Sequence, residues 1–201
     1  MLKKLLKIFD IKKIMKKILG IVILSLLFFS NVNAEERKIK LDKLFTQLKN
    51  TKNLSSAQIV ENKIWEIWEK HTSNDRQGYR LTELLDQGSL LINRKKFNKA
   101  YEIFTQIIVV DPNWSEAWNK RALVLYLMKK YQSSLDDIKI TLSLEPRHFG
   151  ALTGRALNYI ELNQYEKAIE SYKAAQKIYP AIDSAKKMIP QLQELIKDQA
   201  V

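Results

Sequence analysis

Cysteine is absent from the 201-residue chain, and histidine occurs only twice, at His71 and His148. Without cysteine no disulfide can stabilise the fold, although the chain would tolerate an oxidising compartment. Neither histidine has a second histidine or a cysteine at the spacing of a zinc site. Glycine is scarce as well, and neither a G-x-G-x-x-G pattern nor a phosphate-binding P-loop occurs. We therefore expect no metal and no cofactor.

Groups of residues that suggest catalysis are equally few. His71, Ser73 and Asp75 share one polar loop but lack the strand-turn-helix context of a hydrolase nucleophile. The neighbouring carboxylates Asp136 and Asp137 would point in different directions on a helix, so we interpret both as solvated surface. The sequence therefore predicts a protein that is not an enzyme. A cell-wall hydrolase is the remaining catalytic alternative, and it would require one of the two histidines for activity.

Long apolar runs are also lacking, and the most pronounced one, Ile18 to Phe29, has twelve residues that are all apolar or small. It follows a lysine-rich start and precedes small residues that end at Ala34, just before Glu35. This order is typical of a secretory signal peptide, so residues 1–34 are predicted to be a leader that is cleaved after Ala34. Twelve residues are fewer than the roughly 20 of a membrane-spanning helix. An uncleaved membrane anchor is the alternative.

Positive charge is concentrated in this leader. Residues 1–34 contain seven lysines and one aspartate, and the remaining 167 residues carry 27 basic and 21 acidic side chains, a net charge of +6 against +12 for the whole chain. So small a surplus is weak support for nucleic-acid binding, and we expect none. Because Met15 would begin a shorter leader of the same kind, a start at Met1 or at Met15 stays open. An exported chain without cysteine fits the bacterial periplasm, which we expect as its location.

Only four prolines occur, and three of them, Pro112, Pro146 and Pro180, are 34 residues apart. Each follows an apolar, helix-like run, so we expect each to end one copy of a repeated segment. When 34-residue windows are aligned, large residues recur at the fourth, eleventh, seventeenth and twenty-fourth positions, and small ones at the eighth and twentieth. The small sets are Gly88, Ala122 and Ala156, and Ala100, Ser134 and Ala168. This alternation indicates closely packed helices.

The pattern resembles the tetratricopeptide repeat, W-x2-L-G-x2-Y followed by A-x3-F and a proline. The resemblance implies an all-α fold, a right-handed superhelix of antiparallel helix pairs that binds other proteins. It divides the chain after the leader into an atypical helical hairpin and loop at 35–78, an array at 79–181 and a capping helix at 182–201. The array holds a first repeat at 81–114, a second at 115–148 and a third at 149–182.

Two segments narrow the resemblance. SEAWNKRA, residues 115–122, and EPRHFGAL, residues 145–152, resemble segments of a group of exported tetratricopeptide proteins of alphaproteobacteria. Neither segment defines an activity.

Local signals predict where the helices begin and end. Within the repeats we expect helices at 79–93, 98–110, 115–128, 131–144, 149–162 and 165–178. Asn113 and Asn163 are each followed three residues later by Glu, which predicts that both asparagines cap helix N-termini. Pro190 lies within the final amphipathic pattern and is expected to kink or split that helix.

By the resemblance, the first helix of each repeat lines a concave groove in which a partner binds. The residues that we expect to contact the partner are Leu85, Ser89, Asn119, Leu123, Tyr126, Gly150, Thr153, Gly154 and Leu157. A well-known variant of the family clamps the C-terminal carboxylate of chaperone tails with Lys, Asn and Arg side chains. The matching residues here are Leu85, Ser89, Lys120, Gly150 and Gly154, so we expect no such clamp.

Gly150 and Gly154 stand one turn apart at the start of an expected helix, where each glycine costs about 1 kcal/mol relative to alanine. Two explanations stay open. The glycines can allow close packing on the first helix of the second repeat, or they can form a bare patch on which a partner rests.

Arginine and tryptophan recur at set positions of the repeats. Arg121 and Arg155 share the seventh position, and we expect their stems to cover the core while their heads reach an acid between repeats. A ladder of arginines that faces the ligand is the alternative. The four tryptophans fit core packing better than a sugar-binding or aromatic cage. Trp114 lies at a junction between repeats, and its exposure would decide between core packing and a ligand-binding role.

Together these features predict a periplasmic scaffold or adaptor that holds a peptide or helix of an envelope protein in its groove. A membrane-tethered structural subunit that retains residues 1–34 is the alternative. The sequence leaves the identity of the partner and the oligomeric state open.

Overall fold

The computed structural model describes residue 17 and residues 34–51 and 53–199. The predicted leader, its cleavage and the alternative start therefore lie almost wholly outside the described residues. The chain divides into two compact units, residues 1–40 and 41–201, and the helical repeats lie within the second. None of the described helices is long and apolar enough to cross a membrane.

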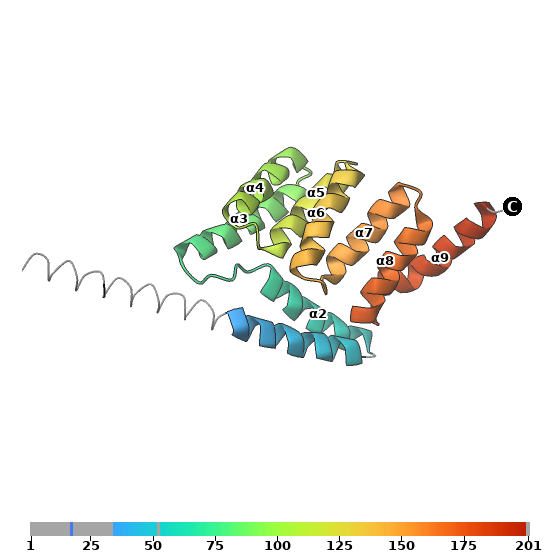
Figure 1. Cartoon of the computed structure of the whole chain (residues 1–201), viewed down its shortest axis with the longest axis horizontal. Coiled ribbons are helices and arrows are strands. Elements are labelled where there is room, and N and C mark those ends of the chain that lie inside the picture. The colour runs from blue at the N-terminus through green and yellow to red at the C-terminus, as the bar shows by residue number, and fades with distance from the viewer. Residues whose placement is uncertain (1–16, 18–33, 52, 200–201) are drawn as a thin grey trace, which may run out of the picture. The chain divides into compact units, whose positions relative to one another are not determined.

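Regular secondary structure in the described ranges is exclusively helical (Figure 1). A first helix includes residues 34–50. It is followed by α2 (Leu54–Trp68), α3 (Arg76–Asn93), α4 (Phe97–Val110), α5 (Ser115–Leu127), α6 (Tyr131–Leu144), α7 (Phe149–Glu161), α8 (Tyr165–Ile178) and α9 (Asp183–Gln199). The six helices from α3 to α8 differ from the expected ranges by at most three residues at either end.

The helices pack as successive antiparallel pairs, α3 with α4, α5 with α6 and α7 with α8 (Figure 1). Small residues at the eighth and twentieth positions let the members of a pair approach closely. A Cβ atom added at Gly88 of α3 would lie 2.6 Å from the ring of Phe104 on α4. In the second repeat, the Ser134 hydroxyl donates to the backbone carbonyl of Ala122 at 2.8 Å. These contacts account for the small residues at both positions.

The 34-residue period also appears in the backbone conformation. Two residues after its last residue, the first helix of each repeat is followed by a residue with positive φ: Lys95 (55°), Lys129 (59°) or Asn163 (54°). At the first of these ends, Lys96 N–H donates to Leu91 C=O and Lys95 N–H to Ile92 C=O, both at 2.8 Å. This is the Schellman arrangement, in which two otherwise unpaired carbonyls are satisfied.

The predicted asparagine caps are wrong. Asn163 takes the left-handed conformation that ends α7, so it cannot also begin α8, which follows Gln164 without a side-chain cap. The residue before α5 is Trp114 rather than Asn113, and it too makes no side-chain cap. Asparagine tolerates the left-handed region better than most residues, which explains its place at the helix end.

The N-terminal hairpin, formed by helical residues 41–50 and α2, lies across the junctions between repeats. In Figure 1, α2 runs beneath the lower ends of α5 to α7. Trp68 on α2 stacks on His148, with ring centroids 4.1 Å apart. The indole of Trp114 donates to Trp68 C=O at 2.8 Å, and the Tyr179 hydroxyl donates to Glu61 at 3.1 Å. These three partners stand within two residues of the equally spaced prolines.

At the other end, α9 packs on α8 and buries Ala185 and Leu192. The helix continues without interruption through Pro190, so the predicted split does not occur. Pro190 and Lys186 are exposed, so solvent can hydrogen-bond the Lys186 carbonyl that the proline leaves without its helical partner.

Candidate binding groove

A pocket of about 250 Å³ opens between α5, α6 and α7, with Trp65 of α2 at its border. Seven of the nine predicted groove residues line it: Asn119, Leu123, Tyr126, Gly150, Thr153, Gly154 and Leu157. The remaining two lie on α3, away from the pocket. Leu85 is buried in the core, and the Ser89 hydroxyl donates to Leu85 C=O at 2.9 Å. That any of the nine contacts a partner stays a prediction.

The rim of the pocket is apolar. Leu123 on α5 and Leu157 on α7 occupy the same position in successive repeats and are 43% and 38% exposed. Leu127, one helical turn beyond Leu123, is 38% exposed. Exposed leucines at matching repeat positions form a strip that could receive apolar side chains of a ligand.

Six further residues line the pocket: Trp65, Lys120, Ala122, Ser134, Ile138 and Asn158. Of these, Trp65 comes from the hairpin and not from a repeat, so the repeat pattern could not predict it. Its position explains Gly150. A Cβ atom on Gly150 would lie 2.5 Å from Trp65 Cη2, so only glycine lets the indole lie against α7. Close packing therefore occurs at Gly150, but against α2 instead of the first helix of the second repeat. At Gly154 an added Cβ would meet Ile138 at an ordinary 3.6 Å, so glycine is not required there by packing.

Lys120 is the only cation at the positions that match the chaperone-tail clamp, and it is already paired. Its Nζ lies 2.8 Å from Glu69 Oε1 and 3.4 Å from Glu116 Oε1. Burial by itself would lower the pKa of Lys120, but the two carboxylates outweigh it and raise that pKa. The lysine is thus charged and neutralised within the chain, and a peptide carboxylate would have to compete with two internal ones.

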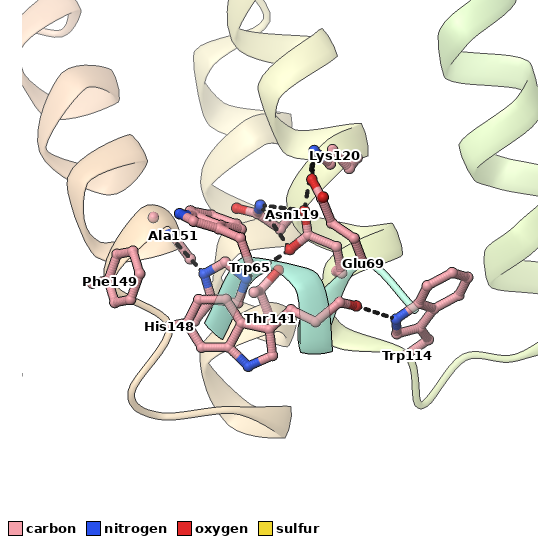
Figure 2. Close-up of polar contacts among 12 residues, drawn as sticks. Trp65, Glu69, Trp114, Asn119, Lys120, Thr141, His148, Phe149 and Ala151 are labelled. Atoms are coloured by element: carbon pink, nitrogen blue, oxygen red, sulfur yellow. Dashed lines mark hydrogen bonds and ion pairs between the residues drawn. The ribbon is translucent and has the colours of Figure 1, made fainter. Parts of the chain in front are cut away.

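Below Lys120 lies a buried polar network that Figure 2 shows in part. His148 precedes α7, and its Nδ1 accepts the Ala151 backbone N–H at 3.1 Å. Nε2 therefore carries the proton of the neutral ring and donates to Glu116 Oε2 at 2.8 Å. Asn119 donates to the same carboxylate at 3.1 Å. Both His148 and Glu116 are completely buried.

Glu116 is ionised in this network. Burial would raise its pKa, but the hydrogen bond from His148 and the nearby Lys120 and Asn119 more than compensate, and the pKa of Glu116 lies below its ordinary value. The network joins α5 to α7, and Lys120 extends it to Glu69 directly after α2. The segments 115–122 and 145–152 therefore lie side by side and form the surface on which the hairpin packs.

Arg147 holds the other helix of the hairpin. Its guanidinium pairs with Asp42 and, at 2.9 Å, with Glu145, and it lies 4.3 Å from the centre of the Phe45 ring. The first helix thus contacts the junction between the second and third repeats.

Arg121 makes a two-pronged ion pair with an acid of its own repeat, so the predicted contact with an acid between repeats is wrong. Its Nε and Nη2 donate to the two carboxylate oxygens of Asp137 on α6, at 2.7 and 2.8 Å. Asp137 is buried, so the prediction that it is solvated is wrong, whereas Asp136 is exposed. The helical turn between adjacent residues points one inward and the other outward. The matching Arg155 donates to the Ser171 hydroxyl at 3.0 Å.

Trp114, whose exposure was to decide between a core and a ligand-binding role, is 4% exposed. Its indole is held by Trp68 C=O and meets the edge of His71. Core packing is therefore its role in the fold.

The polar loop before α3 does not assemble a hydrolase triad. His71 Nε2 lies 2.8 Å from Asp111, which holds the pKa of that carboxyl below its usual value, and Nδ1 accepts the backbone N–H of Ser73. The Ser73 hydroxyl accepts the backbone N–H of Asp75. In the described parts of the chain, no group of three His, Cys, Asp or Glu residues could hold a metal ion.

Comparison with known proteins adds sequence relatives. The tetratricopeptide repeat family matches residues 149–182. A TPR repeat-containing protein of Rhizobium etli is 31% identical over 170 residues, which are 82% of this chain and 81% of the relative. A STIP1 homologue of Dictyostelium discoideum is 28% identical over 101 residues, half of this chain but only 18% of the relative.

Solved structures show the same arrangement of helices. The first TPR of Spaghetti (RPAP3), bound to the HSP90 peptide SRMEEVD, has a TM-score of 0.58 at 19% identity and covers 61% of this chain and 96% of its own. MamA has a TM-score of 0.56 at 22% identity and covers 58% of this chain and 68% of its own. At these identities the likeness concerns the fold, and it confirms the all-α repeat architecture.

Proposed function

Because the chain belongs to the tetratricopeptide repeat family, we propose that it is a binding scaffold and not an enzyme, and that its groove holds an apolar segment of another protein. The observation that carries the proposal is the strip of exposed Leu123, Leu127 and Leu157 beside the pocket on the first helices of the second and third repeats. Apolar side chains that are left exposed at matching positions of a repeat are typical of a protein-binding surface.

The chemistry of the groove favours an apolar ligand over an acidic one. The RPAP3 repeat structure holds the acidic peptide SRMEEVD. In this chain Lys120 is the one charged residue at the five matching clamp positions, and it is neutralised by Glu69 and Glu116. A pocket of about 250 Å³ is below the roughly 300–1,000 Å³ of small-molecule sites. It suits a single large side chain that anchors a peptide or helix.

We place this scaffold in the periplasm, with an envelope protein as partner, because the first 34 residues have the order of a secretory signal peptide. The same apolar run supports a second candidate, a membrane-tethered structural subunit that retains the segment. Sequencing the N-terminus of the protein isolated from cells separates the two. Glu35 as the first residue supports export and cleavage, whereas an intact leader supports the tether.

Binding by the groove is tested with the double variant Leu123→Asp and Leu157→Asp. The matched control is Leu195→Asp on α9, a leucine that is 45% exposed and lies outside the groove. Wild type and control are expected to recover the same specific protein from an envelope extract, and the double variant is expected to lose it while retaining the wild-type circular dichroism spectrum. Recovery of identical proteins by all three would refute the groove as the binding site.

A further inference from the structure

The first repeat carries a second cleft, on the side that faces away from the second repeat. Its volume is about 500 Å³, and its lining includes Arg76, Arg80 and Leu84 of α3 and Gln106 and Val110 of α4. Val110 is 50% exposed and its neighbour Val109 is 77% exposed. This cleft, the first-repeat face, is separate from the groove between α5 and α7.

The repeat geometry shows what kind of element belongs on this face. In the second repeat, the fourth and seventh positions are Trp118 and Arg121, and the guanidinium of Arg121 lies over the Tyr101 ring of α4 and donates to Thr105. The seventh position therefore contacts the second helix of the preceding repeat, and Trp118 packs against the hydrophobic cluster to which the α4 residue Phe104 belongs. The same positions in the first repeat are Leu84 and Gln87.

The chain supplies no such helix to the first repeat from its described residues. The hydrophobic cluster around α3 and α4 includes no residue from 41–50 and none from α2. The hairpin that precedes the array lies instead on the junctions between repeats, through Trp68 and Glu61. The first-repeat face is thus shaped for a helix, and α2 does not provide it.

Charge identifies the partner further. Two arginines and no acidic residue line the cleft. Neither Arg76 nor Arg80 forms an ion pair with any described residue. Two copies of this face would bring four arginines together, which opposes self-association through it. The leader is disfavoured as an occupant for the same reason, since residues 1–34 contain seven lysines and one aspartate.

We propose that the first-repeat face binds an α-helix of another protein, apolar on one side and flanked by acidic residues, which stacks on α3 and α4 as the second helix of a preceding repeat would. Leu84 and Val110 contact the apolar side of this helix, and Arg76 and Arg80 pair with its carboxylates. This interaction is independent of the groove, so the chain has two surfaces and can join two proteins.

The probe is a pair of synthetic helical peptides with leucines at helical spacing, one with glutamates and one with lysines at the flanking positions. The purified full chain is expected to bind the glutamate peptide in calorimetry and not the lysine peptide. Arg76→Glu with Arg80→Glu should weaken the glutamate peptide by at least about tenfold and allow the lysine peptide to bind. The matched control, Arg94→Glu with Lys96→Glu, reverses the same charge at the other end of α3 and should bind as wild type does.

Three outcomes overturn the proposal. Equal affinity for the two peptides would show that charge does not select the ligand. Equal binding by the Arg76/Arg80 variant and the wild type would place the site elsewhere. Sedimentation that shows a dimer lost on Val110→Asp, or binding to anionic lipid vesicles in place of the glutamate peptide, would assign the face to self-association or to a membrane. Loss of groove binding in the Leu123/Leu157 variant has no effect on any of these measurements.

Discussion

The two ends of the repeat array differ in how the neighbouring helices cover them. At the C-terminal end α9 covers α8 as the next helix of a solenoid would, whereas at the N-terminal end the hairpin adds no residue to the core around α3 and α4 and crosses the junctions between repeats. Repeat proteins usually depend on contacts between neighbours. Here the hairpin packs directly on the second and third repeats, whereas it reaches the first repeat only near its end, where the Trp114 indole donates to Trp68 C=O. The difference teaches that the later repeats should resist unfolding together, while the first is held by its neighbour and by the contacts of Thr82, Asp111 and Trp114 with His71 and Trp68.

The largest effect is expected from Trp68→Ala, which removes the side chain at the centre of the contact between the hairpin and the repeats. Trp68 is 2% exposed and contacts His148 and Phe149. Loss of a buried aromatic side chain costs about 3–5 kcal/mol, which urea denaturation measures. Hydrogen exchange should show faster exchange in α2 and α7 and unchanged exchange in α3. Uniform acceleration over all helices would show that the first repeat is not independent of the hairpin.

A smaller effect, with a characteristic pH dependence, is expected from Glu116→Gln. Because burial is outweighed by His148, Lys120 and Asn119, the folded-state pKa of Glu116 lies below its ordinary value of 4.5. The ionised carboxylate therefore stabilises the fold above about pH 4.5, and this contribution is lost as the pH falls through the lowered folded-state pKa.

The variant should lose about 1–3 kcal/mol at pH 7 and show a flatter decline of stability on acidification. Asp136→Asn, at an exposed carboxylate of the second repeat, is the control and should follow the wild-type pH curve. A variant curve that parallels the wild type would mean that the buried pair does not govern acid stability.

The two glycines of α7 give a matched pair of substitutions. Gly150→Ala forces a Cβ atom against Trp65 and should destabilise the chain by about 1–3 kcal/mol. Gly154→Ala has room for the methyl group and should stabilise α7 by about 0.5–1 kcal/mol. Thermal denaturation compares both with the wild type. Equal shifts in the two variants would contradict the contact between the hairpin and the third repeat.

The smallest effect concerns the helix ends, which all three repeats share. Lys129 has a φ of 59°, and Lys129→Gly should stabilise the chain by about 0.5–1 kcal/mol because glycine adopts this conformation without strain. Lys130→Gly, at a residue with φ −91°, should give no gain. Lys95→Gly should stabilise the chain as much as Lys129→Gly, because Lys95 has nearly the same φ. Equal gains would show that the first and second repeats share the same backbone conformation at this turn and differ only in their contacts with the rest of the chain.

Features that follow the 34-residue period could be predicted from the sequence, because each depends on contacts between residues close in the chain or one repeat apart. The helix ranges and the small residues at Gly88 and Ser134 belong to this class. The position of the hairpin could not be predicted, since Trp68 and Trp114 are 46 residues apart and Glu61 and Tyr179 are 118 apart, which no period relates.

One residue of the sequence nevertheless indicated the contact between the hairpin and α7. Gly150 marked a place where something approaches α7, but the sequence could not say whether the approaching group belongs to this chain or to a partner. The buried pair of Glu116 and His148 could not be predicted, because nothing in the sequence relates a glutamate in the first turn of α5 to a histidine just before α7. Their pairing appears only when the segments 115–122 and 145–152 are brought together.

The contact between Glu61 and Tyr179 has a consequence for how the protein is made. Synthesis proceeds from the N-terminus, so the two helices of the hairpin are made before the repeats. Tyr179, the hydrogen-bond partner of Glu61, follows 118 residues later. Trp65 and Trp68 therefore lack their partners His148 and Phe149 until the third repeat has been synthesised. A chaperone that shields these indoles during that interval would speed the production of folded protein, and it would have nothing to bind once Tyr179 has closed the structure.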